Sequence, residues 1–63
     1  MNNRVCELRR KKGLSQQELA DLCGVSRTTI WKIETGNVNS AIAKTLIAIA
    51  KALDAKVEEI FLL

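Results

Sequence analysis

Two helix N-caps with a single glycine between them constrain the fold of this chain more than any other feature. Ser15 stands three residues before Glu18, which is the capping-box spacing at the first turn of a helix. Ser26 repeats the N-cap, and Gly24 between the caps can end the first helix in the left-handed conformation. Each cap is flanked by two apolar residues at hydrophobic-staple spacing: Leu14 with Leu19, and Val25 with Ile30. Two short helices joined by a glycine-containing turn describe a helix-turn-helix, predicted here over about residues 16–34.

The two predicted helices, about 16–23 and 27–34, each have an apolar and a polar face. The inner faces are expected to hold five residues, with a small alanine where the helices approach: Leu19, Ala20, Cys23, Ile30 and Ile33. The outer face of the second helix presents four residues that suit a DNA major groove: Arg27, Thr28, Trp31 and Lys32. A solvated amphipathic helix is the alternative interpretation, but the capped helix and glycine turn in front favour DNA binding.

Length and composition favour a single all-α domain over residues 1–63 and argue against an enzyme. The chain has 63 residues, 48% of them hydrophobic, with no Pro, and its apolar residues recur at helical spacing. It has no His, which removes the commonest general base and metal ligand, and no nucleophile–base pair is evident. Cys6 and Cys23 lack any CxxC or Cys/His companion. We therefore expect no catalytic residues, no metal, no cofactor and no small-molecule ligand.

The same composition bears on location. No stretch resembles a signal peptide, and none is apolar for long enough to span a bilayer. We therefore expect a cytoplasmic protein with free thiols and no membrane partner, with Cys23 in the core and Cys6 partly exposed.

Positive charge is concentrated at the N-terminal end, although the net charge is only +3. Residues 1–12 contain one acidic residue, Glu7, and five cations: Arg4, Arg9, Arg10, Lys11 and Lys12. Such a cluster beside a candidate recognition helix predicts a phosphate-contacting surface, to which we assign Arg9 and Lys12. Cations at the end of a helix are also favoured by its macrodipole, and both explanations can hold.

The remaining pattern predicts three more helices. Asn2 or Asn3 can cap a first helix that runs to about Lys12 and stops at Gly13. A fourth helix, about 41–53 with Ser40 as its cap, carries one apolar stripe: Ile42, Leu46, Ile49 and Leu53. Ile47 lies off that stripe, so it is either edge core or contact surface. A last short helix is predicted at about 57–61.

The chain ends on four apolar residues, from Ile60 to Leu63. A small domain seldom leaves such a run in water without a use. We expect Val57, Ile60 and Phe61 to help close the core, and we assign the dimer contact to this tail: Phe61, Leu62 and Leu63. The alternative is a hydrophobic end without a partner.

These residues carry a family resemblance. The run ELRRKKGLSQQELADLCGVSRTTIWKIETG, followed by TLIAIAKALDAKVEEIF, resembles the phage Cro/repressor-type helix-turn-helix family, also called the XRE family. The resemblance covers nearly the whole chain. It implies a compact, lambda-repressor-like five-helix bundle that binds operator DNA as a homodimer and regulates transcription.

The resemblance also implies roles for particular residues. It implies that the exposed face of the second motif helix contacts bases through four residues: Arg27, Thr28, Trp31 and Lys32. Among them, Arg27 is expected to contact a guanine, and the Thr28 methyl group a thymine methyl group. Trp31 has the alternative of lying against the sugar–phosphate wall, and Lys32 of reaching a phosphate. Phosphate contacts fall to seven polar residues around it: Gln16, Gln17, Ser26, Thr29, Thr35, Asn37 and Asn39. Gln16 is in addition expected to brace the recognition helix.

The chain departs from the family pattern at two turns. Asn39-Ser40-Ala41 stands where many members have Pro-Ser, which makes the loop contacts the least certain of these assignments. Asp54 stands where Gly is common, which leaves the conformation of that turn open.

The resulting expectation is a sequence-specific, double-stranded DNA-binding regulator that acts as a homodimer. We take repression by occlusion as the mode, while activation by contact with polymerase stays open. The alternatives are an antitoxin, or a protein-interaction module that keeps the fold without DNA. The basic face of residues 27–32 argues against an interaction module, since an idle face needs no such charges.

Overall fold

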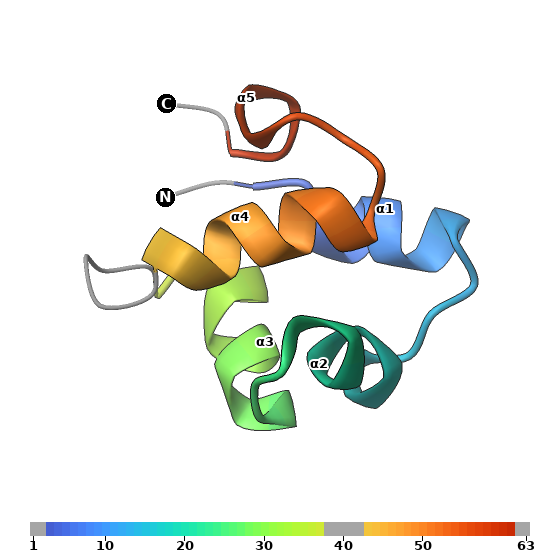
Figure 1. Cartoon of the computed structure of the whole chain (residues 1–63), viewed down its shortest axis with the longest axis vertical. Helices are drawn as coiled ribbons and strands as arrows, with labels where there is room; N and C mark the ends of the chain where they lie inside the picture. The colour runs from blue at the N-terminus through green and yellow to red at the C-terminus, as the bar shows by residue number, and fades with distance from the viewer. Residues whose placement is uncertain (1–2, 38–42, 62–63) are drawn as a thin grey trace.

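Five α-helices are the regular elements of the computed structural model, which describes residues 3–37 and 43–61. In chain order they are α1 (Val5–Lys11), α2 (Gln16–Cys23), α3 (Arg27–Glu34), α4 (Ala43–Ala52) and α5 (Val57–Ile60). In Figure 1, α4 runs across the middle, with α5 on one side and with α2 and α3 on the other. The predicted all-α class with a helix-turn-helix is confirmed. The predicted cap Ser40, the apolar Ile42 and the loop residue Asn39 lie outside the described residues.

Both predicted N-caps of the helix-turn-helix form. The Ser15 Oγ accepts from the backbone N–H of Glu18 at 3.0 Å, while the Glu18 carboxylate accepts from the Ser15 N–H at 2.9 Å. The Ser26 Oγ accepts from the Thr29 N–H at 3.2 Å and so starts α3. Between them Gly24 lies at φ +70°, a conformation in which a Cβ is strained. The short α2–α3 connection thus follows from local sequence signals.

The core is built where the apolar stripes of all five helices meet. Ten apolar residues have at most 6% of their surface exposed: Val5, Leu19, Ala20, Ile30, Ile33, Ile49, Ala50, Leu53, Ile60 and Phe61. The half-buried Leu46 and Cys23 pack against them. The prediction that Val57 joins the core is wrong, because this first residue of the four-residue α5 lies outside with 37% of its surface exposed. Ile47, with 53% exposed, is surface rather than edge core.

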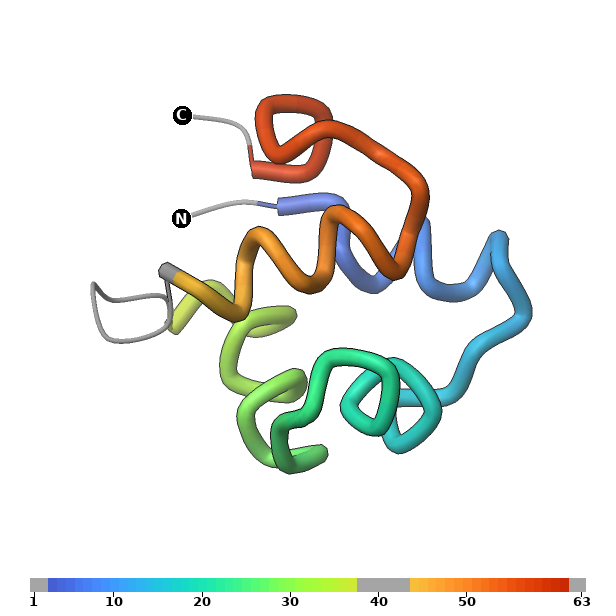
Figure 2. The backbone as a smooth tube through the Cα atoms, viewed as in Figure 1, coloured from blue at the N-terminus to red at the C-terminus, as the bar shows by residue number. Residues whose placement is uncertain are grey.

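Residues 3–4 and 60–61 lie side by side (Figure 2). The Arg4 N–H donates to the Ile60 carbonyl at 2.7 Å, and Asn3 forms an isolated antiparallel bridge with Phe61. The Asn3 side chain accepts from the Val5 N–H at 3.1 Å, but the N-cap of α1 is Arg4, so the prediction that Asn3 caps this helix is wrong. The Asn3 Nδ2 also donates to the Ile33 carbonyl at 2.7 Å, near the end of α3. The N-terminal segment therefore joins α3 to the last turn of the chain.

The turn after α4 keeps a left-handed residue even though no glycine is there. Asp54 lies at φ +52°, its N–H donates to the Lys51 carbonyl, and the Ala55 N–H donates to the Ala50 carbonyl at 3.0 Å. These two bonds form a Schellman motif, the motif that also ends α1 and α2, where the left-handed residue is Gly. Asp54 therefore occupies the left-handed position that Gly13 and Gly24 occupy in the other two turns, and this conformation strains its backbone.

Replacing Asp54 by glycine is expected to raise the free energy of unfolding by about 0.5–1 kcal/mol. A non-glycine residue pays about 1–2 kcal/mol in this conformation, which exceeds the entropy that glycine adds to the unfolded chain. Urea titration of the two proteins measures the difference. Asp54→Ala should shift the midpoint the opposite way, and a glycine variant less stable than the wild type would contradict the strain.

Candidate nucleic-acid interface

The two faces of α3 differ as predicted. Ile30 and Ile33 are fully buried, because residues three apart share the side of the helix that packs on α1 and α2. The opposite side carries the four exposed residues predicted to meet bases: Arg27, Thr28, Trp31 and Lys32. Trp31 has 51% of its surface exposed, which is unusual for so large an apolar side chain.

Those four side chains share a second property. Across the described residues, none of them has a hydrogen bond or ion pair within the chain. The guanidinium of Arg27, the hydroxyl of Thr28, the indole N–H of Trp31 and the ammonium of Lys32 are therefore all available to an external partner. Arg27, Thr28 and Trp31 together line a shallow depression of about 290 Å³, called the Trp31 hollow below.

The residues predicted to contact phosphate are instead already engaged with each other or with neighbours. The Gln17 Nε2 donates to the Asp21 Oδ1 at 2.9 Å, and the hydroxyls of Ser26 and Thr29 are 3.0 Å apart in a shared hydrogen bond. Two backbone groups at the start of α2 are not engaged in this way. The backbone N–H groups of Gln16 and Gln17 have no acceptor among the described residues. A helix N-terminus with open N–H groups favours an anion such as a phosphate.

The turn after α3 holds the next two predicted phosphate contacts. The Thr35 Oγ1 donates to the Lys32 carbonyl at 2.9 Å, and the Asn37 Nδ2 lies 3.4 Å from the Thr35 Oγ1. Both side chains are exposed, so each keeps polar atoms that face solvent. Their contact with a phosphate stays a prediction.

A buried ion pair fixes the far end of α3, and it was not predicted. The Arg9 Nε donates to the Glu34 Oε2 at 2.7 Å, and the Arg9 and Glu34 side chains are only 10% and 7% exposed. The remaining donors of Arg9 reach the Leu14 carbonyl at 2.8 Å and the Cys6 Sγ at 3.5 Å. The Gln16 Nε2 completes the group with a 3.1 Å bond to the Glu34 Oε1, which is the bracing role expected of Gln16. One carboxylate thus ties α1, α2 and α3 together.

The charges in this network stabilise one another. Burial by itself raises the pKa of Glu34, but hydrogen bonds from Arg9 and Gln16, together with the Arg9 charge, hold that pKa below its usual value. The hydrogen bond to Glu34 raises the pKa of Arg9. Both groups therefore stay ionised in the folded protein at neutral pH.

The assignment of Arg9 to phosphate contact is consequently wrong. Its guanidinium is occupied inside the protein, and the exposed Arg4 is paired with Glu7 at 2.7 Å. The exposed cations left in the N-terminal cluster are Arg10, Lys11 and Lys12. The sequence did carry a signal for the pair. Arg9 lies four residues after the buried Val5, and Glu34 lies four after the buried Ile30, so both charges fall on inward-facing stripes.

The predicted dimer residues divide between the core and the end of the chain. Phe61 is 3% exposed and packs in the core, so its side chain offers almost no surface to a partner. This burial corrects the assignment of Phe61 to the dimer contact. Leu62 and Leu63 lie outside the described residues.

The described part of the chain has neither a metal-binding cluster nor a membrane-spanning helix. In residues 3–37 and 43–61, no group of three or more His, Cys, Asp or Glu side chains is placed to hold a metal ion. None of the described helices is long and apolar enough to cross a membrane. Burial raises the pKa of the Cys23 thiol, so this cysteine is a weak nucleophile.

Comparison with known proteins places this geometry in a family. The helix-turn-helix family model matches residues 7–60. An uncharacterized HTH-type transcriptional regulator of Archaeoglobus fulgidus is 40% identical over 62 residues, which cover 98% of this chain and 86% of the relative. The uncharacterized HTH-type transcriptional regulator YgzD of Bacillus subtilis is 40% identical over 61 residues, covering 97% and 91%.

A solved structure agrees with this assignment. The restriction-modification controller protein C.AhdI from Aeromonas hydrophila aligns with a TM-score of 0.81 at 40% identity, covering 92% of this chain and 86% of the other. The chain belongs to the helix-turn-helix family of transcriptional regulators, and the predicted resemblance to the XRE type is confirmed. The family implies regulation through DNA binding.

Proposed function

We propose that this protein is a transcriptional repressor that binds an inverted-repeat operator as a homodimer, with one α3 helix in each major groove. The observation that carries the proposal is the exposed face of α3, where four side chains suited to base edges have no hydrogen-bond or ion-pair partner among residues 3–37 and 43–61. An idle surface helix gains nothing from leaving an indole, a guanidinium and an ammonium unpaired on one face. Occupation of a promoter by such a dimer blocks polymerase by occlusion.

The division of work on the proposed operator follows from the bonds within the chain. Side chains with free donors read bases, with Arg27 donating to guanine O6 and N7 and with Lys32 on a base or phosphate. The backbone N–H groups of Gln16 and Gln17 at the start of α2 hold a phosphate and set the register of the protein on the DNA. The Arg9–Glu34–Gln16 network keeps α2 and α3 at a fixed angle while they do so.

Selection of bound sequences from random duplex DNA, at near-physiological salt with excess competitor, tests the proposal. An inverted repeat with half-sites about one helical turn apart, about 34–36 Å, is expected. An unenriched pool would refute sequence-specific binding and would favour the protein-interaction module. A reporter gene placed behind the selected site then separates repression from activation.

Arg27→Ala is expected to weaken binding to the selected operator by about 1–3 kcal/mol and to relax specificity at one base pair of each half-site. The loss should be much smaller on random DNA, because a bidentate guanine contact is absent there. Fluorescence anisotropy with both duplexes measures the two losses. Lys44→Ala, an exposed cation on α4, is the matched control. Equal losses of Arg27→Ala on both duplexes would contradict direct reading of a base.

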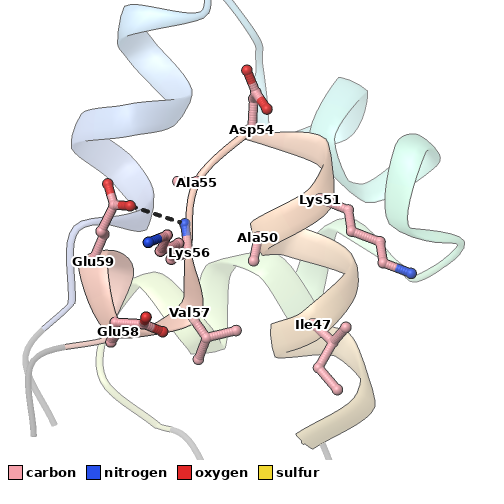
Figure 3. Close-up of a pocket in the computed structure, with 9 residues that line it drawn as sticks. All are labelled: Ile47, Ala50, Lys51, Asp54, Ala55, Lys56, Val57, Glu58 and Glu59. Atoms are coloured by element: carbon pink, nitrogen blue, oxygen red, sulfur yellow. Dashed lines mark hydrogen bonds between the residues drawn. The ribbon is translucent and has the colours of Figure 1, made fainter.

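The surface between α4 and α5 is the dimer contact we propose in place of Phe61. A hollow of about 710 Å³ lies there. Figure 3 draws the residues that line it, with the exposed apolar side chains of Ile47 and Val57 at one end. Charges of both signs surround it: Lys51 and Lys56, with Asp54, Glu58 and Glu59. A two-fold axis brings each patch against its own copy, so lysines of one protomer can face carboxylates of the other. This self-complementarity supports a second copy of the chain as the occupant.

Val57→Glu is expected to raise the dimer dissociation constant at least tenfold, about 1.4 kcal/mol. The new charge would be desolvated in the contact and would add to the negative charge of Glu58 and Glu59. Sedimentation velocity over a concentration series measures the effect, and Lys44→Glu, outside the hollow, controls for the change in charge. An unchanged constant would place the contact elsewhere, and a wild type that stays monomeric at all concentrations would refute the homodimer.

A further inference from the structure

We propose that the Trp31 hollow reads the C5-methyl group of a thymine next to the guanine that Arg27 contacts. The inference rests on the proposed function, DNA binding through α3, and adds the class of base step that the protein selects. It assigns specificity to Trp31 in addition to Arg27.

The placement of the three side chains comes from helix geometry. Residues 27, 28 and 31 are separated by one, three and four positions, so Trp31 shares one face with both others. The three side chains line one depression of about 290 Å³. Half of the Trp31 surface is in contact with water in the free protein. Covering that surface with a methyl group is favourable because it removes apolar area from water.

The chemistry of the lining selects among bases. Arg27 and Trp31 supply only N–H donors and apolar surface, and the Thr28 hydroxyl is the one side-chain acceptor. Thymine offers an acceptor, O4, beside its methyl group, and guanine offers two acceptors, O6 and N7. Cytosine presents an amino donor that only the Thr28 hydroxyl can accept, and it has no methyl group to cover the apolar face of Trp31. The hollow therefore fits a thymine beside a guanine better than a cytosine.

The spacing along α3 agrees with neighbouring base pairs. Four residues of α-helix span about 6 Å, while successive base pairs are about 3.4 Å apart. Arg27 and Trp31 are thus less than two base steps apart. A methyl group held between Trp31 and Thr28 then belongs to the pair adjacent to the guanine.

The test uses the duplex obtained by selection and replaces its thymines by deoxyuridine, one position per half-site at a time. Deoxyuridine keeps O4 and the pairing with adenine but lacks the methyl group. At one thymine beside the conserved guanine, binding should weaken about fourfold for each half-site altered. Cytosine at that position should bind worst, and 5-methylcytosine should recover part of the loss.

Protein variants then assign the effect to the hollow. Trp31→Ala should abolish the difference between thymine and deoxyuridine, while Lys32→Ala should weaken both duplexes and keep their ratio. Thr28→Val, which keeps a methyl group without the hydroxyl, should keep the ratio as well. Thermal unfolding followed by circular dichroism confirms that each variant is folded.

Two results would overturn the inference while leaving the proposed function intact. Specific binding with no thymine sensitive to deoxyuridine would mean that no methyl group is read. A sensitivity that persists in Trp31→Ala would mean that another residue reads it. Failure to bind any specific duplex would instead refute the proposed function, and this inference with it.

Discussion

Glu34→Ala is expected to lower the free energy of unfolding by about 3–5 kcal/mol. The substitution leaves the Arg9 guanidinium buried without its main acceptor. It also removes the acceptor of the Gln16 side-chain amide. A domain of this size has a total stability of the same order, so a large fraction of the variant should be unfolded at room temperature. Urea titration followed by circular dichroism measures the loss.

The chain offers a matched control for that loss. Arg4 and Glu7 form an ion pair with the same 2.7 Å separation, but their side chains are 40% and 53% exposed. Water and salt screen such a pair, so Glu7→Ala should leave the urea midpoint close to that of the wild type. Equal losses for Glu7→Ala and Glu34→Ala would mean that burial does not set the strength of the Arg9–Glu34 pair. Removing both charges, as in Arg9→Met with Glu34→Leu, should cost less than the sum of the single losses.

The pair should also be visible in the pH dependence of stability. Because the folded pKa of Glu34 lies below its unfolded value, its ionisation stabilises the folded state fully above about pH 4.3. That contribution is lost as the pH falls through the folded pKa. Glu34→Gln should remove this part of the pH dependence of the free energy of unfolding. A variant whose stability depends on pH as in the wild type would contradict the role of Glu34.

Phe61→Ala is expected to lower the free energy of unfolding by about 3–5 kcal/mol through the cavity it leaves. Phe61 is 3% exposed and packs with Ile60 beside the N-terminal segment. Unfolding should be measured at a concentration where sedimentation shows monomer. If Phe61 is a core residue, Phe61→Ala lowers the free energy of unfolding of the monomer by the full amount. If Phe61 were only a dimer contact, the substitution would leave the stability of the monomer unchanged.

Val57→Ala is the control for Phe61→Ala within the same end of the chain. Val57 is 37% exposed, so its truncation should change monomer stability only slightly while weakening the proposed dimer. Phe61→Leu should fall between the wild type and Phe61→Ala. If Phe61→Ala unfolds like the wild type in the monomer, the assignment of Phe61 to the core is wrong.

The parts of the fold that could be predicted are those determined by neighbours in sequence. The Ser15 and Ser26 caps and the turn at Gly24 depend on residues within four positions, and all three formed as expected. The exposed face of α3 followed from helical periodicity once those caps set its start. Local signals therefore determine both the helix-turn-helix and the direction in which the exposed side chains of α3 point.

The parts that escaped prediction depend on residues far apart in sequence. Arg9 and Glu34 are 25 positions apart, and only the packing of α1 on α3 turns two apparently exposed charges into one buried pair. The same holds for Val57, since an apolar run shows which residues are hydrophobic but not which side of a four-residue helix faces inward. The bonds of Gln17 with Asp21 and of Ser26 with Thr29 are local by contrast, and a hydroxyl or amide suits a neighbour or a phosphate equally, so phosphate contact by these residues stays a prediction.

The pairing of Asn3 and Arg4 with Ile60 and Phe61 has a consequence for how the protein is made. A growing polypeptide can form the α2–α3 unit early, since its contacts are local, but the core stays open until residues 60 and 61 have been added. Until then the buried faces of α1 and α4 lack their cover, and Asn3 lacks the bridge to Phe61 that accompanies its side-chain bond to α3. Cooperative folding of this domain therefore waits until residues 60 and 61 have been added, and a ribosome paused before α5 should hold a nascent chain that proteases still cut.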